Sequence, residues 1–240
     1  ALMGGYLGMG SHVQDFESRL TTMFGRHVAT ASTGTTALQL ALQSINLGPG
    51  DEVLVPSLTY VATFQAISAT GARPVACEVG EQTLTLDLQH AKSQLSDRTR
   101  AVVPVHYGVP LAGATEVYQF ARANALRVVE DAAHAFGSYQ DGAFVGSRGD
   151  ITVFSFDPIK NITTIDGGCV VSNDHQVIDR VRDLRVLGVI GDSKARAKHT
   201  RLYDYDVLEQ GWRYHLNNVG ALIGLAQLDR LEQMRTRRQE

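Results

Sequence analysis

The chain has 240 residues, of which 44% are hydrophobic and 20% charged, enough to bury the core of one large domain. The formal net charge of −3 argues against a nucleic-acid-binding surface, and no apolar run approaches the roughly 20 residues of a membrane helix. The two cysteines, Cys77 and Cys169, lie in apolar runs. We therefore expect buried, reduced thiols and a cytoplasmic protein without nucleic-acid or membrane partners.

Helices and strands alternate along the chain. A first helix is predicted to begin at Ser11, as its N-cap, and to end at Phe24. Further helices are predicted from Gln176 and over 35–46, 60–69, 86–95, 114–125 and 217–235. Strands are predicted over 27–31, 52–55, 74–79, 101–105, 126–130, 151–156 and 168–172. Buried strands separated by helices indicate an α/β fold with a mostly parallel, doubly wound sheet.

Lys160 is one of only four lysines, and it follows a predicted strand. An ammonium group is costly to desolvate, so a lysine in an apolar, glycine-bounded segment suggests a chemical role. The alternative is an ordinary surface-loop lysine. Lys92 lies on a polar helix, and Lys194 and Lys198 lie in the polar run over 191–201, which is predicted to be a mobile loop.

Asp131 ends the predicted strand over 126–130, where a carboxylate is poorly suited to a core. Ligands of open α/β sheets bind beyond the carboxyl ends of the strands, and Lys160 lies beyond another such end. An amine and a carboxylate in one crevice are what pyridoxal 5′-phosphate requires, for a Schiff base and for the pyridine nitrogen. The alternative for Asp131 is a salt bridge or a helix cap.

Other residues could complete such a site. The segment over 32–36 follows a strand and opens a helix, so its amides and hydroxyls could bind a phosphate, or could simply cap the helix. Ser155 could add a hydroxyl to the phosphate. Tyr60 could stack on the ring or be a core aromatic, and His134 could lie near the ring or cap a turn. The eight histidines show no metal-ligand spacing, so no metal site is predicted.

Five segments together resemble one family. They read Ser-Thr-Gly-Thr-Thr-Ala-Leu (32–38), Gly-Pro-Gly-Asp-Glu-Val (48–53), Glu-Asp-Ala-Ala-His (130–134), Phe-Ser-Phe-Asp-Pro-Ile-Lys-Asn (154–161) and Asp-Gly-Gly (166–168). In this order they resemble the DegT/DnrJ/StrS sugar aminotransferases, which are fold-type-I pyridoxal-phosphate enzymes. The resemblance covers nearly all of the chain and implies an N-terminal segment and helix over 1–25, then a large cofactor-binding domain over 26–240.

The resemblance also implies roles for individual residues. Lys160 would form the Schiff base, Asp131 would pair with the pyridine nitrogen, His134 would approach the 3-oxygen, and Tyr60 would stack on the ring. Family members with histidine in place of the lysine are dehydratases, so Lys160 favours an aminotransferase. Such enzymes usually move an amino group from glutamate, or glutamine, to a nucleotide-linked keto sugar.

The phosphate would be held by Gly34, Thr35 and Ser155, and by an asparagine of the partner subunit in a homodimer with shared active sites. That asparagine belongs to an Asn-Tyr-Arg segment, whereas this chain reads Trp-Arg-Tyr-His over 212–215, so Arg213 or Asn217 would have to replace it. The N-terminal segment over 2–9 and the helix after Tyr214 would lie in the dimer interface.

The chain lacks an initial methionine and a signal peptide, and it stops about where the family's small C-terminal domain would begin. We therefore expect a trimmed or processed piece without that domain. Two alternatives remain. One is another fold-type-I reaction, such as elimination or desulfuration, which would need a cysteine near the lysine. The other is a piece that binds cofactor or dimerises without turnover.

Overall fold

The computed structural model describes residues 6–108, 110–192 and 204–240. The strands are β1 His27–Ala31, β2 Glu52–Pro56, β3 Arg73–Cys77, β4 Thr99–Val102, β5 Arg127–Asp131, β6 Tyr139–Gln140, β7 Ala143–Phe144, β8 Ile151–Ser155 and β9 Gly168–Ser172. The helices are α1 Ser11–Phe24, α2 Gly34–Ser44, α3 Val61–Ser68, α4 Leu88–Ser93, α5 Ala114–Ala123, α6 His175–Leu184, α8 Asn218–Leu228 and α9 Leu231–Gln239. None of these helices is long and apolar enough to cross a lipid bilayer.

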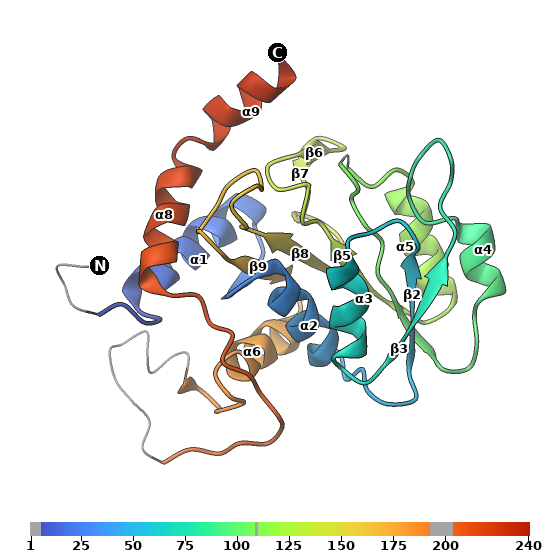
Figure 1. The fold of residues 1–240 in the computed structure, drawn as a ribbon, viewed down its shortest axis with the longest axis horizontal. Coiled ribbons are helices and arrows are strands. Elements are labelled where there is room, and N and C mark those ends of the chain that lie inside the picture. Colours follow the sequence, from blue (N-terminus) through green and yellow to red (C-terminus); the bar gives the residue numbers. More distant parts are fainter. Residues whose placement is uncertain (1–5, 109, 193–203) are drawn as a thin grey trace.

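One seven-stranded sheet organises the fold, in the order β1-β9-β8-β5-β4-β2-β3 (Figure 1). The neighbours from β8 through β5, β4 and β2 to β3 pair in parallel, whereas β9 pairs antiparallel with both β1 and β8. Six strands therefore point the same way and end at one edge of the sheet, and β9 starts from that edge. This confirms the mostly parallel α/β fold predicted from the sequence.

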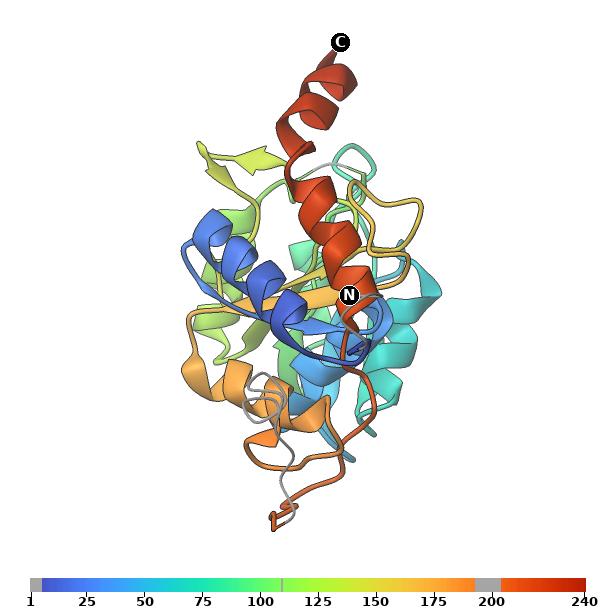
Figure 2. The same cartoon turned by 90° about the vertical axis from the view of Figure 1, so that its left-hand side faces the viewer.

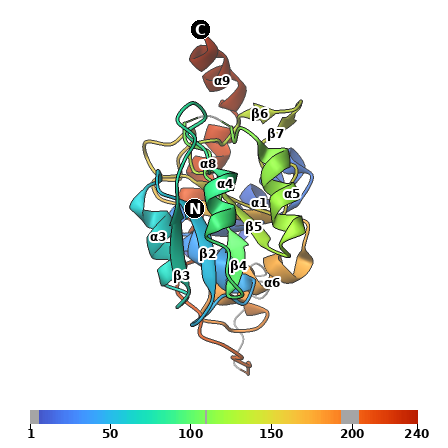
Figure 3. The ribbon, with the colours of Figure 1, turned by 90° about the vertical axis from the view of Figure 1, so that its right-hand side faces the viewer.

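Helices cover both faces of the sheet. On one face, apolar side chains of α2, α3 and α6 share a core with the strands. On the other face, α1 and α8 pack side by side over β8 and β9 (Figure 2), and α4 and α5 cover β2 and β4. Figure 3 shows α3 and α5 on opposite sides of the sheet. The strands are thus buried from both sides, which explains their continuous apolar runs.

The predicted helix over 217–235 is wrong in one respect, because α8 and α9 are separate helices. The chain bends at Asp229 and Arg230, and α9 stands clear of the sheet (Figure 1). Leu231 is buried, and a Cβ on Gly137 would lie only 3.0 Å from its Cδ1 atom. The bend therefore turns Leu231 onto a glycine of another segment, which local helical spacing does not reveal.

The prediction that Ser11 caps α1 is also wrong. Gly10 is the N-cap, and no side chain of the helix itself caps it. Asn218, the first residue of α8, supplies the missing acceptor instead. The short hairpin of β6 and β7 was not predicted, because strands of two residues carry no periodicity. The loop predicted over 191–201 lies almost wholly outside the described residues.

Candidate active site

The residues predicted to form a site all lie at the carboxyl edge of the sheet. Asp131 and Ser155 are the last residues of β5 and β8, which are paired neighbours. Gly34 begins α2 just after β1, and Tyr60 precedes α3 just after β2. Parallel strands place these ends together, as expected for a ligand site in an open α/β sheet.

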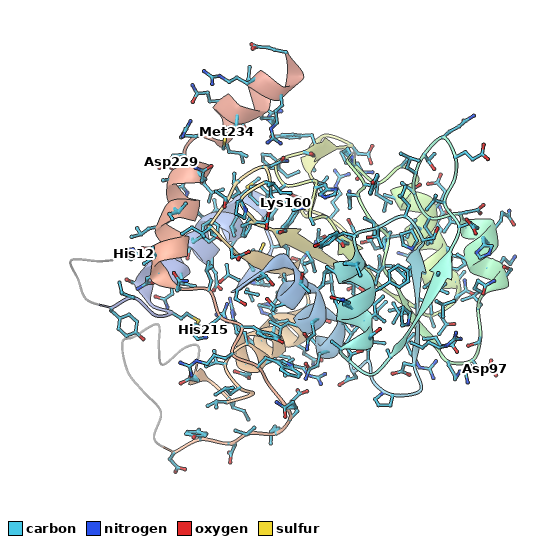
Figure 4. All side chains as sticks on the ribbon, in the orientation of Figure 1. His12, Asp97, Lys160, His215, Asp229 and Met234 are labelled. Carbon is cyan, nitrogen blue, oxygen red and sulfur yellow. The ribbon has the colours of Figure 1, made fainter. Side chains whose placement is uncertain are left out.

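Lys160 lies in the loop that leaves β8 (Figure 4). The loop turns on Asp157, whose backbone oxygen accepts from the Lys160 amide at 3.0 Å and whose Oδ1 accepts from the Ile159 amide at 3.0 Å. The lysine side chain is half-buried. Among the described residues, no hydrogen bond or ion pair engages its ammonium group, so the amine is available for chemistry.

Asp131 is buried, with 5% of its surface exposed. Its Oδ2 accepts a hydrogen bond from the Thr63 hydroxyl at 2.8 Å, and its Oδ1 accepts from the Ala133 amide at 3.1 Å. Within the described parts of the chain, no arginine or lysine pairs with it. The carboxylate is therefore held by neutral donors, and its charge is not cancelled by a protein cation.

His134 lies beside both of these groups. Burial lowers the pKa of His134, the positive charge of Lys160 lowers it further, and the carboxylate of Asp131 raises it. Because the net change is downward from an ordinary value near 6.5, the imidazole is mainly neutral at pH 7. The imidazole therefore feels the charges of both the amine and the carboxylate. The ring of Tyr107 lies 6.1 Å from the His134 ring.

The start of α2 meets the end of β8 and the start of β9. A Cβ on Gly34 would lie 2.7 Å from the Ser155 Cβ, and one on Gly168 would lie 2.6 Å from the Thr33 oxygen. Thr33 caps α2 and forms a capping box with Thr36. The capping interpretation of this segment is thus correct, and the helix terminus still presents amides beside the Ser155 hydroxyl, where an anion is favoured.

Thr35 and Tyr60 are exposed near this edge. Thr35 lies in the first turn of α2, and Tyr60 is 72% exposed at the start of α3. The alternative of a core aromatic is therefore wrong for Tyr60. Asn217 accepts from the Gly220 amide as the N-cap of α8, and Arg213 pairs through its backbone with Val186. Among the described residues, neither side chain is hydrogen-bonded to the start of α2 or to Ser155.

Sequence reasoning missed Thr63 and His106. Thr63 is the hydrogen-bond partner of Asp131. The only feature of the nearby sequence that could have drawn attention to Thr63 is Thr59, four residues earlier, whose hydroxyl pairs with that of Thr63. The His106 ring accepts from the Leu111 amide through Nδ1 at 2.9 Å, so Nε2 carries the proton that bridges to Glu130 at 2.8 Å. His106 thereby braces β5 from the side of the sheet opposite Asp131, since successive strand residues alternate faces.

Comparisons with known proteins identify similar chains. A model of the DegT/DnrJ/EryC1/StrS aminotransferase family matches residues 1–240. The structure resembles S. venezuelae DesV, solved in complex with a ketimine intermediate, at 35% identity and a TM-score of 0.86. It also resembles the sugar aminotransferase CalS13 from Micromonospora echinospora, at 35% identity and a TM-score of 0.87. A third similar structure is the PLP form of Spr1654 from Streptococcus pneumoniae, at 26% identity and a TM-score of 0.87.

Each comparison covers 97% of this chain but a smaller part of the other protein. The chain spans 60% of DesV, 64% of CalS13 and 62% of Spr1654.

Proposed function

Because the chain belongs to the DegT/DnrJ/EryC1/StrS aminotransferase family, we propose that residues 26–240 form the cofactor-binding domain of a pyridoxal-phosphate aminotransferase, preceded by the segment 1–25. The enzyme moves an amino group from glutamate, or glutamine, to a nucleotide-linked keto sugar in the cytoplasm. The observation that carries the proposal is that Asp131 ends β5 and Lys160 lies in the loop leaving β8, its paired neighbour, at the sheet edge where such ligands bind.

The site suits pyridoxal 5′-phosphate. At Gly34, only glycine leaves room, because a Cβ there would lie 2.7 Å from the Ser155 Cβ. The α2 terminus with the Thr35 and Ser155 hydroxyls can hold a phosphate dianion. The unneutralised carboxylate of Asp131 suits a protonated ring nitrogen, and the exposed Tyr60 ring offers an aromatic face for stacking.

The chain's own residues then divide the work. Bound pyridoxal phosphate supplies an electron sink for the charge left when a Cα proton is removed. Lys160 would hold the cofactor covalently through Nζ, and once released the same Nζ would take the Cα proton and return it in the 1,3-proton shift. The Asp131 carboxylate would hold the proton on the ring nitrogen, and the neutral His134 ring would face the 3-oxygen.

A second copy of the chain completes the site in this proposal. Four large apolar side chains are more than half exposed near the edge, at 72% for Tyr60, 54% for Val61, 84% for Ile159 and 57% for Ile165. Apolar groups gathered around a site mark an interaction surface. The expected contribution of the segment over 2–9 concerns residues that are only partly described, and α8 buries one face against α1 within the same subunit.

Two other functions are less well supported. Elimination or desulfuration would need a reactive cysteine at the site, but burial and the Glu17 carboxylate raise the pKa of Cys169 well above its ordinary value. Such a thiol is inert. A cofactor-binding or dimerising piece without turnover is favoured only by the share of the relatives that the chain spans.

Reductive trapping tests the proposal. The protein is mixed with pyridoxal phosphate, reduced with borohydride and digested, and the modified peptide is identified by mass spectrometry. We expect the adduct on Lys160, its loss in Lys160→Ala, and its retention in Lys92→Ala, a control on the exposed face of α4. An adduct on Lys92, Lys194 or Lys198, or none in the unmodified chain, would overturn the assignment.

A further inference from the structure

A chain of two hydroxyl groups leads from the start of α3 to the Asp131 carboxylate. The Thr59 and Thr63 hydroxyl oxygens are 2.7 Å apart, and Thr63 Oγ1 is 2.8 Å from Asp131 Oδ2. An ionised carboxylate only accepts hydrogen bonds, so the single Thr63 proton points to Asp131. Thr63 must then accept from Thr59, and both hydroxyl protons are oriented towards the carboxylate.

The remaining contacts hold Asp131 in place. The Ala133 amide donates to Oδ1 at 3.1 Å. The Asp131 amide donates to the Pro104 oxygen at 2.9 Å, and its carbonyl accepts from the His106 amide at 3.0 Å. With the backbone fixed on both sides and one donor on each oxygen, the carboxylate has one orientation, and each oxygen keeps a free lone-pair direction.

We propose that Thr63 is a positioning residue for the reaction, acting through Asp131, and that Thr59 strengthens its effect. This inference rests on the proposed function. A hydrogen bond to a charged acceptor is stronger than a neutral one, and a donor further along the chain polarises it. The bond fixes which direction Asp131 presents to the ring nitrogen and draws part of the negative charge towards Thr63.

Removing the hydroxyl therefore has two consequences. A buried carboxylate oxygen loses its donor, so the carboxylate is free to rotate. The negative charge on Asp131 also becomes less dispersed, which favours the protonated forms of a cofactor beside it. Both effects are local, because His106 and Glu130 continue to brace β5 from the other face.

Three variants isolate the hydroxyl. Thr63→Val keeps the side-chain shape and loses the donor, whereas Thr63→Ser keeps the donor. Thr152→Val is the matched control: Thr63 and Thr152 are both fully buried, and Thr152 on β8 has a hydroxyl with no hydrogen-bond partner among the described residues. The same substitution there removes no bond to a carboxylate.

The measurements are the pH midpoint of the absorbance change of bound pyridoxal phosphate and the rate of the half-reaction with glutamate. In Thr63→Val we expect the midpoint to rise by at least about 0.5 pH unit and the rate to fall about 10- to 100-fold. Thr63→Ser and Thr152→Val should stay within about 0.2 unit and about threefold of the unmodified chain. A purely structural role for Thr63 would lower stability without moving the midpoint.

The outcomes separate this inference from the proposed function. A chain that traps no cofactor on Lys160 contradicts the function itself. A chain that does trap it, with Thr63→Val matching Thr152→Val in midpoint and rate, overturns the role of Thr63 alone. Should Thr63→Val fail to fold, Thr59→Val decides the question, because it leaves Thr63 in place. We expect a smaller upward shift there, and no shift would reject the hydroxyl chain.

Discussion

Asp131 is buried but has no cationic partner within the described residues, so no protein cation neutralises its negative charge. We predict that Asp131→Asn leaves the fold intact. The amide oxygen can still accept from the Ala133 amide, and the amide NH2 group can donate to the Thr63 hydroxyl once that hydroxyl rotates. The asparagine side chain carries no charge to hold a proton on the ring nitrogen. The glutamate half-reaction should slow by several powers of ten, at about 1.4 kcal/mol for each tenfold.

Stopped-flow absorbance of the cofactor-loaded protein measures this rate. Circular dichroism and cofactor affinity serve as controls for folding and binding. A near-normal half-reaction in Asp131→Asn would rule out the role of Asp131 as the partner of the ring nitrogen.

Glu52 is a second buried carboxylate, but its role is structural. Arg73, Arg98 and Ser96 donate to it, at 2.7, 2.8 and 2.7 Å. The Arg73 hydrogen bond is the largest cause that lowers the pKa of Glu52 to about 2. A pKa below the unfolded value contributes stability at neutral pH, and this contribution disappears as the pH falls from about 4.5 to about 2.

We therefore predict that Glu52→Gln lowers the free energy of unfolding at pH 7 by roughly 1.5–3 kcal/mol, the range for hydrogen bonds to a charged group. It should also flatten the loss of stability between about pH 4.5 and 2. Urea unfolding across this range measures both effects. Asp97→Asn, at an exposed carboxylate in the neighbouring loop (Figure 4), is the control and should behave like the unmodified chain.

At the scale of elements, α1 depends on α8 for its first turn. Asn218 Oδ1 accepts from the Gly10 and Val13 amides at 3.1 and 3.4 Å, and Nδ2 donates to the Tyr6 oxygen at 2.9 Å. A Cβ on Gly10 would lie 2.8 Å from Asn218 Nδ2, so glycine permits this approach. One buried side chain therefore joins the N-terminal segment to α8 and replaces the cap that α1 lacks.

We predict that Asn218→Ala lowers the free energy of unfolding by about 2 kcal/mol, because it leaves buried amides without an acceptor. Asn217→Ala, which removes only the exposed cap of α8, should cost about 1 kcal/mol. Urea unfolding gives both free-energy losses, provided that the slope of the free energy against urea concentration is the same in each variant as in the unmodified chain. Equal losses in the two variants would contradict the cross-helix role of Asn218.

At the scale of the whole molecule, the exposed apolar side chains at the carboxyl edge of the sheet predict a dimer. We expect the unmodified chain to be a dimer that binds pyridoxal phosphate, since a two-fold interface uses the same patch on both copies. Ile159→Asp should yield a monomer with weakened cofactor binding. Leu84→Asp is the matched control, because Leu84 is exposed at 41% in the loop after β3, the outermost strand of the sheet.

Sedimentation velocity gives the mass of each variant, and titration with pyridoxal phosphate gives its affinity. A cofactor-loaded monomer of the unmodified chain would refute the shared site.

Local sequence determined most of the elements. The bounds of α1 and β9 agree with the apolar spacing of Ser11–Phe24 and Gly168–Ser172, and the other six sheet strands begin or end within a few residues of their predicted positions. These signals are local, because periodicity and turn residues act over one element. The motifs around Lys160 and Asp131 also indicated the site, since they lie at strand ends where parallel sheets gather ligands.

Only the tertiary structure decided which distant groups meet. It reversed β9 relative to its neighbours, separated α8 from α9 at Asp229 and Arg230, and placed Asn218 on Gly10, 208 residues away. It also brought Thr63 to Asp131 across 68 residues. No local propensity specifies such pairs, because strand order and helix packing set them. A threonine or asparagine also looks the same in sequence whether its side chain caps its own helix or bonds to another element.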